Sequence, residues 1–312
     1  MTATPENPGA LNWLLVVLTS AIWGTAFMSM KVALEGFGPV TVAALRVSLG
    51  IPVLLIGGQM LGQGIGRLGS RRIWVFAALV GVLNFSGPFF LLSWGQQFVP
   101  SALAGVAMGT VPLFLIPLAI FFLKDEKVTL AKAAGLIFGF SGLVLLVGGD
   151  QLASVSTPGA TLGALACVST ALSYAIGSIV TRRSPPVPPV AFTAAALIVA
   201  SAIMIPAALV FEGWPQDVSV RPFAAVLYAA VFPTAIASFM RVTIIKSAGS
   251  LFMSLASYMV PVWAVFFGIV LMGEDLPPTL LVAVALILGG IGLSQWKAFA
   301  AIARSAFSRS KA

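Results

Sequence analysis

The chain alternates long apolar stretches with short polar breaks. A helix needs about 20 apolar residues to cross roughly 30 Å of hydrocarbon, and most of the stretches reach that length. The breaks are rich in glycine, proline and charged residues, as turns are, and none is long enough to form a domain. We predict ten membrane-spanning helices, at residues 11–34, 40–61, 73–96, 100–123, 133–149, 160–181, 191–211, 222–245, 250–272 and 279–296.

Composition supports this all-α, polytopic membrane fold. Of the 312 residues, 59% are apolar and only 8% are charged, whereas an ordinary soluble domain carries about 25% charged residues. The apolar stretches are also far longer than the roughly 10-residue alternating strands of a membrane barrel. A soluble enzyme and a membrane barrel are therefore both excluded.

Positively charged residues predict the orientation in the membrane. Thirteen of the 17 Lys and Arg residues fall in alternate loops and at the C-terminal end, and only Lys31 and Arg221 fall on the opposite side. Because positively charged loops stay on the cytoplasmic side, we expect both termini in the cytoplasm, with residues 297–312 as a basic tail. The net charge of +8 then reflects membrane topology and not binding to nucleic acid. The segment before the first span lacks a basic start, so we expect no removable signal peptide.

The two halves of the sequence resemble each other at offsets of 148 to 151 residues. The matches follow one another in order, which indicates an internal repeat with halves at residues 1–149 and 150–296. Each half holds five predicted spans. This odd number requires the second half to insert upside down, as in many secondary carriers with a midplane substrate site. The matched residues are Trp23 with Tyr174, Pro112 with Pro261, Glu126 with Glu274, Gly139 with Gly289 and Gly142 with Gly292.

Several of these features together resemble one known family. The Trp23-Gly pair in the first span, the Pro112 helix that ends in Lys-Asp-Glu126, and the glycine-rich fifth and tenth spans resemble the EamA-type drug/metabolite transporters. The resemblance extends over about residues 11–296, and within that superfamily the chain looks most like the YddG-type bacterial amino acid exporters. It implies export of amino acids, aromatic ones among them, and of related metabolites across the inner membrane.

Candidate substrate contacts come from polar and aromatic side chains within spans, which usually face a cavity or another helix. They gather in the first, third, sixth, eighth and ninth spans, whereas the fifth and tenth are almost wholly aliphatic and glycine. We therefore expect the first, third, fourth, sixth, eighth and ninth spans to line the path, with the fifth and tenth at the periphery. The candidate substrate-binding residues are Trp23, Arg46, Asn84, Trp94, Met108, Tyr174, Ser178 and Tyr258.

Three of these candidates carry the strongest argument, and each has a structural alternative. The Trp23 indole offers a substrate an apolar face and one N–H donor, or it packs between helices. A buried Asn84 amide costs on the order of a few kcal/mol unless it is bonded, so it binds substrate or joins two helices. Arg46 lies roughly 9 Å inside the second span at 1.5 Å per residue. It either reaches back to the interface or holds a fixed charge for a substrate carboxylate. The second half has Ala196 where the first has Arg46, which argues against a symmetric site.

Prolines interrupt the spans and suggest where helices bend. Pro112 and Pro261, a matched pair, fall at equivalent depths in the fourth and ninth spans. A proline removes a helical hydrogen bond and permits a kink. We expect this pair to act as hinges that bend when one face of the cavity opens and the other closes.

The remaining composition excludes most active-site chemistry. The chain has no histidine, so it lacks imidazole metal sites and histidine bases. Its single cysteine, Cys167, cannot form an internal disulfide and is expected to be an apolar filler. The sequence also lacks the P-loop that ATP-driven transport needs. We expect no metal, no cofactor and no enzymatic activity. The expected partners are a small-molecule substrate and membrane lipid, with the protein as a monomer or weak homodimer.

The acidic residues bear on how transport is driven. None lies well inside a span, whereas proton- and sodium-coupled carriers commonly use an intramembrane carboxylate. We expect a facilitative carrier or an exchanger that works by alternating access. Two alternatives stay open: a proton-coupled multidrug or metabolite efflux carrier that uses Glu126, Glu274 or Asp275 at span ends, and a non-transporting membrane scaffold.

Overall fold

The computed structural model of the chain describes residues 9–122, 130–148, 159–216, 218–248, 253 and 255–294. All regular structure in these residues is helical, which confirms the all-α fold class for this part of the chain. The helices are α1 (Gly9–Ala33), α2 (Pro39–Met60), η1 (Ile65–Arg67), α3 (Arg71–Gly81), η2 (Val82–Ser86), α4 (Gly87–Gly95), α5 (Ser101–Met108), α6 (Val111–Phe122), α7 (Leu130–Gly148), α9 (Ala160–Arg183), α10 (Pro189–Phe211), α11 (Val220–Ala229), η3 (Ala230–Ile236), α12 (Ala237–Ala248), α14 (Leu255–Met272) and α15 (Pro278–Ser294).

Several of the helical segments could cross a membrane, which identifies a polytopic membrane fold. Within the described residues, seven are long and apolar enough to cross by themselves: Gly9–Ala33, Pro39–Met60, Arg71–Gly95, Ser101–Leu118, Ala160–Arg183, Pro189–Phe211 and Val220–Arg241. Three shorter apolar helices are Ala133–Leu146, Tyr258–Met272 and Pro278–Leu293. The count of ten spans and the upside-down relation of the halves stay predictions. Glu126 and the predicted basic tail at residues 297–312 lie outside the described residues.

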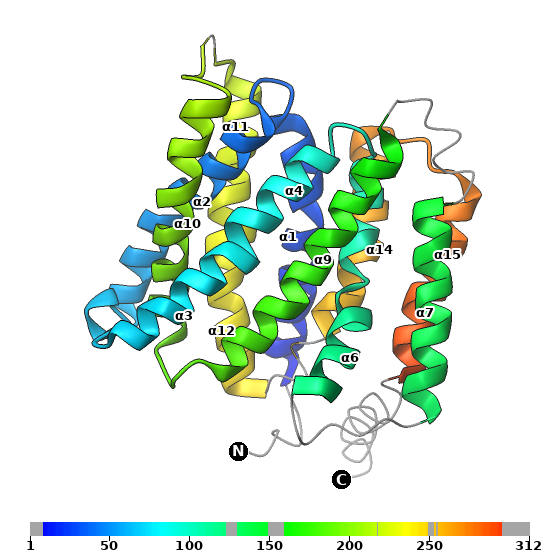
Figure 1. Cartoon of the computed structure of the whole chain (residues 1–312), viewed down its shortest axis with the longest axis horizontal. Coiled ribbons are helices and arrows are strands. Elements are labelled where there is room, and N and C mark those ends of the chain that lie inside the picture. The colour runs from blue at the N-terminus through cyan, green and yellow to red at the C-terminus, as the bar shows by residue number, and fades with distance from the viewer. Residues whose placement is uncertain are drawn as a thin grey trace.

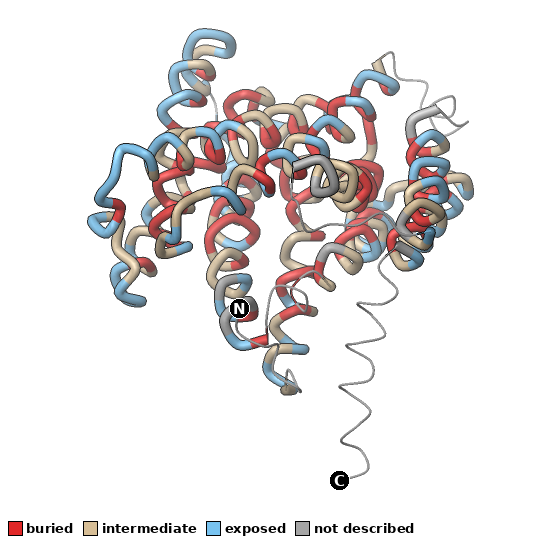
Figure 2. The backbone as a smooth tube through the Cα atoms, turned by 60° about the horizontal axis from the view of Figure 1, so that its bottom comes forward, coloured by how far each residue is buried: buried red, intermediate tan, exposed pale blue. Residues whose placement is uncertain are grey.

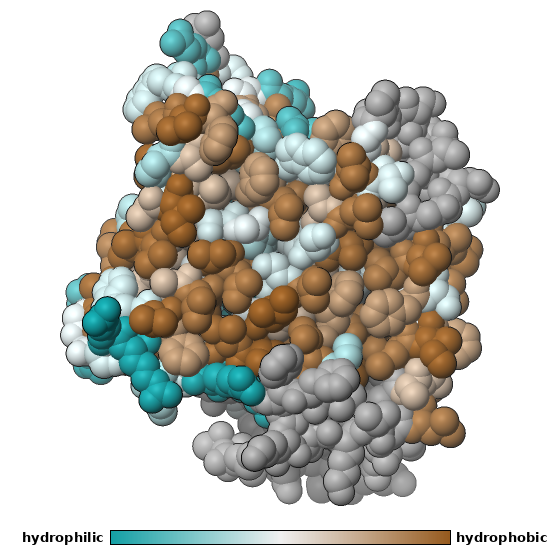
Figure 3. Space-filling view, viewed as in Figure 1, coloured by the Kyte–Doolittle hydropathy of each residue, from teal (hydrophilic) through white to brown (hydrophobic). Residues whose placement is uncertain are grey.

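The outside of the bundle is apolar between two hydrophilic ends. Figure 3 shows a broad belt of hydrophobic residues, with hydrophilic residues gathered above and below it. Large apolar side chains are exposed, Met60 by 82% and Phe211 by 79%. The buried residues lie toward the middle of the bundle (Figure 2), and many of them are alanine. Small residues let helices approach closely, which is how helices commonly pack within a membrane.

The two ends of the bundle carry opposite charges. The turns after α1, α10 and α14 lie at one end (Figure 1), which we call the acidic end for its residues Glu35, Glu212 and Glu274. The turns after α2 and α9 lie at the other, the basic end, where α9 finishes with Arg182 and Arg183. This division follows the charge pattern of the sequence. Which end faces the cytoplasm stays a prediction.

The helices α7 and α15 lie together at one edge of the bundle (Figure 1). Their backbones are in close contact, because a Cβ on Gly290 would lie 2.5 Å from the carbonyl oxygen of Gly135. At the opposite edge, α2 packs against α10. Between the edges, α4 packs against α9, and α1 packs against α11, α12 and α14. The aliphatic fifth and tenth spans thus lie at the periphery, as their composition predicts.

Three of the membrane-crossing segments are interrupted along their length. The π-helical segments η2 and η3 interrupt α3–α4 and α11–α12, and they begin 148 residues apart, at Val82 and Ala230. The segment predicted at residues 100–123 is broken at Gly109 and Thr110 into α5 and α6. Because π-turns inside helices frequently occur at functional sites, η2 and η3 direct attention to the centre of the bundle.

Candidate substrate-binding site

The segment η3 contains Pro233, which has no N–H and so leaves a backbone carbonyl without its helical donor. Two side chains donate hydrogen bonds to two different backbone carbonyls of this region. The Thr234 hydroxyl donates to the carbonyl oxygen of Ala229 at 2.9 Å. The Trp23 indole N–H, from the middle of α1, donates to the carbonyl oxygen of Pro233 at 3.2 Å. Trp23 is therefore fixed against η3 by a hydrogen bond.

The segment η2 is held in a similar way by α9. The Ser173 hydroxyl donates to the carbonyl oxygen of Leu83 at 2.7 Å. The neighbouring Asn84 side chain lies against Gly177 of α9, which has no Cβ to obstruct it. Within the described part of the chain, Asn84 Oδ1 is buried without a hydrogen-bond partner. Asn84 thus lies between two helices, where it helps set how closely they approach.

Arg46 is a buried cation in the middle of the bundle. It is 6% exposed and lies about 10 Å from the start of α2 at 1.5 Å per residue. Its Nε donates to Thr234 Oγ1 at 3.1 Å, and its Nη1 lies 2.8 Å from Met30 Sδ. Its Cζ lies 3.8 Å from the centroid of the Phe89 ring. The guanidinium therefore points into the bundle and not back to the interface.

No carboxylate forms an ion pair with Arg46 among the residues that the structure describes. A buried charge without a counter-ion is costly, and an ionisable group inside a membrane protein usually marks a substrate or ion pathway. The groups in contact are a thioether, a hydroxyl and an aromatic ring, and Tyr174 of α9 is close enough to interact electrostatically. A ligand carboxylate would supply the missing negative charge.

We call Trp23, Arg46, Phe89, Tyr174 and Thr234 the central site. They come from five segments (α1, α2, α4, α9 and η3) and from both halves of the sequence. Thr234 connects them, because it accepts from Arg46 and lies next to the carbonyl that binds Trp23. One cation between aromatic walls suits a solute that carries a carboxylate and an apolar body.

Two of the predicted contact residues have local roles. Trp94 packs against Phe98, in the turn after α4 at the acidic end, with the rings tilted and their centroids 4.9 Å apart. The Ser178 side chain is exposed, and its hydroxyl donates within α9 to the carbonyl oxygen of Tyr174 at 2.7 Å. The Arg46 guanidinium instead contacts Thr234, Met30 and Phe89.

Two others, Met108 and Tyr258, pack against the largest buried apolar cluster of the described residues. Met108 ends α5 immediately before the break, and Tyr258 lies near the start of α14. Of the eight predicted contact residues, the structure brings Trp23, Arg46 and Tyr174 together in the central site.

Phe89 and Met30 contact Arg46, and the sequence gives no sign of this. A phenylalanine or methionine in an apolar span looks like any other core or lipid-facing residue. Thr234 does have a usable signal, since a hydroxyl residue beside a mid-span proline can bond the carbonyl that the proline leaves free. The acid-to-backbone contacts of Glu212 and Glu274, described below, also escape prediction because both residues lie in turns.

The matched prolines differ in their local structure. Pro112 is the second residue of α6, in the first turn after the break, where a proline costs no helical hydrogen bond. Pro261 lies inside α14. The two interruptions face each other, because a Cβ on Gly109 would lie 2.8 Å from Pro261 Cγ. The hinge role of the pair stays a prediction.

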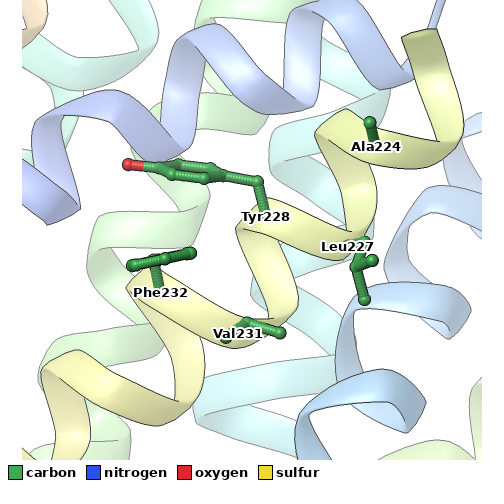
Figure 4. Close-up of a pocket in the computed structure, with 5 residues that line it drawn as sticks. All are labelled: Ala224, Leu227, Tyr228, Val231 and Phe232. Carbon is green, nitrogen blue, oxygen red and sulfur yellow. The ribbon is translucent and has the colours of Figure 1, made fainter.

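A shallow apolar groove of about 300 Å³ lies along one face of α11 and η3 (Figure 4). The Tyr228 hydroxyl points toward α1, 2.8 Å from Thr25 Oγ1, and the Tyr228 ring stacks on Phe232 with centroids 4.9 Å apart. None of its lining residues is charged, and none belongs to the central site. Its lining residues are Ala224, Leu227, Tyr228, Val231 and Phe232.

Two known proteins with similar sequences are named as an exporter and as a transporter. The chain is 27% identical over 287 residues to a probable terminal-alkyne amino-acid exporter of Streptantibioticus cattleyicolor, which covers 90% of this chain and 92% of that protein. It is 29% identical over 258 residues to the uncharacterized inner membrane transporter YedA of Escherichia coli K12, and this match covers 82% of this chain and 81% of that protein.

The fold and the family are also shared with known proteins. A chain of known crystal structure superposes with a TM-score of 0.66 at 23% identity, and the match covers 93% of this chain and 98% of the other, which shows a common fold. Residues 11–148 and 159–295 each match the EamA-like transporter family. Because these matches span nearly the whole sequence, the chain belongs to the EamA-like transporter family.

Proposed function

We propose that this protein is a secondary transporter of the bacterial inner membrane that exports amino acids, aromatic ones among them, and related small carboxylates. The family supports transport, and the exporter and inner-membrane relatives support the substrate class and the location. The observation that carries the substrate class is Arg46, a buried cation with no carboxylate partner in the described residues.

The proposed architecture is ten spans in two upside-down repeats, residues 1–149 and 150–296, with both termini in the cytoplasm. The double family match supports the repeat, as do the two π-helical segments that begin 148 residues apart, at Val82 and Ala230. Helix pairing supports it too. The contact of α1 with α14 has a counterpart in the contact of α9 with α5 and α6, and the contact of η2 with α10 has one in that of η3 with α2.

In the proposed mechanism the central site binds solute and opens to each end of the bundle in turn. The solute carboxylate accepts hydrogen bonds from the Arg46 guanidinium, which Thr234 holds in place through Nε. The Phe89 and Tyr174 rings and the Trp23 indole contact the apolar body of the solute. Opposed bends near Pro112 and Pro261 let α5–α6 and α14 open one face and close the other.

The proposed transport is facilitative or exchange-driven. The acidic residues that the structure describes lie at helix ends and in turns, so the membrane interior lacks the carboxylate that ion-coupled carriers commonly use. A proton-coupled efflux carrier is the competing mechanism, and a gradient requirement would identify it.

Efflux from proteoliposomes tests the proposal. Vesicles loaded with phenylalanine and given no pH or sodium gradient should show efflux that saturates with substrate. An absolute need for either gradient would contradict facilitation, non-saturating flux would indicate a pore, and no flux of any amino acid would refute the substrate class.

The Arg46→Gln variant tests the site itself. A charge-assisted hydrogen bond contributes about 1.5–3 kcal/mol, so the variant should raise the apparent KM for phenylalanine by about 10- to 100-fold. Arg46→Lys is the matched control, because it keeps the charge and should lose less. Phenethylamine, which lacks the carboxylate, should be affected little by either change. If Arg46→Gln affected phenylalanine and phenethylamine equally, Arg46 would not bind the substrate carboxylate.

A further inference from the structure

Two carboxylates at the acidic end are bound to the first N–H groups of helices in the other half of the sequence. Glu212, after α10, accepts from Val40 N at 2.9 Å and from Thr41 N at 2.8 Å, in the first turn of α2. Glu274, after α14, accepts from Ser101 N at 2.6 Å and from Ala102 N at 3.0 Å, in the first turn of α5. Each carboxylate uses both oxygens on consecutive N–H groups.

The chemistry of these contacts is favourable for a physical reason. The first N–H groups of a helix have no partner inside the helix, and the helix dipole favours a negative charge there. Glycines leave room for the carboxylates: Gly38 lies against the Glu212 carboxylate, and a Cβ on Gly268 would lie 2.6 Å from Glu274 Oε2. The two acids are therefore seated in shaped positions at a helix start.

A cation reinforces the contact at Glu274. Lys31, at the end of α1, donates to the carbonyl oxygens of Gln96 and Val99 at 2.6 and 3.2 Å, and interacts electrostatically with Glu274. The Gln96 amide in turn donates to the carbonyl oxygen of Phe27 at 2.8 Å. The ends of α1, α4 and α14 and the start of α5 are thus joined by one polar network.

At the basic end the halves are joined by neutral side chains, among them Ser247 of α12, which donates to Asn12 Oδ1 of α1 at 2.6 Å. There Gln63, after α2, accepts from Val190 N at the start of α10 at 3.3 Å. This contact has the same form as the one at Glu212, with the partners exchanged between the halves. It uses a neutral amide, one oxygen and a longer distance, so it holds less firmly than a carboxylate on two N–H groups.

The path from the central site toward the acidic end is closed in this structure. Val42 lies one helical turn from Arg46 on the acidic side of α2 and is 0% exposed. It belongs to a buried apolar cluster with Phe27, Leu92 and Leu103, which come from three other helices. The same cluster contains Val226 of α11 and Val260 and Ala264 of α14, so an opening in this direction requires α2 and α5 to move away from these helices of the second half.

We propose that Glu212 and Glu274 are latches that hold the acidic end closed, and that both release their helix starts when the central site opens there. This inference rests on the proposed transport function. It assigns the two acids a conformational role that does not require them to carry protons or touch solute.

Cysteine accessibility in nanodiscs tests the latches, because both faces of the protein are open to reagent and no transport is needed. In a Cys167→Ala background, a Val42→Cys reporter should react slowly with a hydrophilic maleimide. Glu212→Gln and Glu274→Gln should each speed the reaction by about tenfold, since each removes a charge-assisted contact. A Leu54→Cys reporter, at a fully buried position of α2 three turns toward the basic end, should not become faster.

Glu35→Gln is the matched control at the same end. Its carboxylate also joins the halves, 3.3 Å from Arg221, but both side chains are well exposed, by 43% and 70%. An exposed pair contributes little, so the reporter rate should change less than about twofold. Gly268→Ala, which displaces the Glu274 carboxylate without changing charge, should speed the labelling of the reporter as Glu274→Gln does. If Glu274→Gln does not fold, Gly268→Ala tests the Glu274 contact in its place.

Unchanged Val42→Cys labelling in the folded Glu212 and Glu274 variants would overturn the latches, as would an equal rise at Leu54→Cys. If these variants label faster but the protein transports no amino acid, the latch role is supported and the proposed substrate class is refuted.

Discussion

The close contact between α7 and α15 yields a quantitative test of which helices matter for transport. A Cβ added to Gly290 would lie 2.5 Å from both the carbonyl oxygen of Gly135 and the N of Gly139. These are backbone atoms, which cannot rotate away, so the two helices must separate. Overpacking of this kind costs about 1–3 kcal/mol, and Gly290→Ala should have a free energy of unfolding lower by that amount than a glycine-to-alanine change that meets no neighbour.

Gly289 provides the matched control for this change. A Cβ there meets nothing within 4 Å, and alanine gains about 1 kcal/mol over glycine in a helix. Since both variants gain that propensity, the difference between Gly289→Ala and Gly290→Ala isolates the overpacking. Unfolding titrations in mixed micelles measure it, and efflux per folded molecule should be normal in both. Equal stabilities would refute the close packing, and slow efflux in folded Gly290→Ala would refute the peripheral role.

Three further predictions concern the path. Trp23→Phe removes the N–H that binds the Pro233 carbonyl, so it should lower stability by about 1 kcal/mol and weaken phenylalanine counterflow; a variant as stable as the wild type would show that the bond contributes nothing. Pro112→Ala should slow exchange with little change in thermal stability, because the proline lies in the first turn of α6; unchanged exchange would remove the hinge. Glutamate should compete poorly with phenylalanine in counterflow, because its second carboxylate finds no second cation; equal competition would contradict a site built on Arg46 alone.

The positions of the helices follow from the apolar runs and the residues that end them. The prediction at 191–211 corresponds to α10 at Pro189–Phe211, and the prediction at 11–34 to α1 at Gly9–Ala33. Apolar runs and the residues that end them do not predict interruptions within a span. A π-turn at Val82 has the same apolar composition as the helix around it, and it differs only in how the carbonyls are paired.

The central site is predictable only in part, for a similar reason. Arg46 and Trp23 stand out because a charge or an indole in a span requires an explanation, whereas the Phe89 ring beneath the guanidinium does not. Alignment of the halves also cannot tell which side of a helix faces its neighbour. It selects Gly289, yet Gly290 is the glycine that lies against the α7 backbone, because packing and not sequence offset decides the contact face.

The proposed preference for one carboxylate would follow from the departure of the second half from the first. Ala196, the counterpart of Arg46 in the sequence, is fully buried where α10 packs against α3, and a Cβ on Gly81 would lie 2.7 Å from its carbonyl oxygen. The second half thus has a close backbone contact, and no cation, at the position that corresponds to Arg46. A solute with two carboxylates would bring one of them against the rings of Phe89 and Tyr174 without a partner, which is costly in a desolvated site. Under the proposed function, the repeat supplies a common framework of helices, and the single arginine of the first half accounts for a preference for one negative charge.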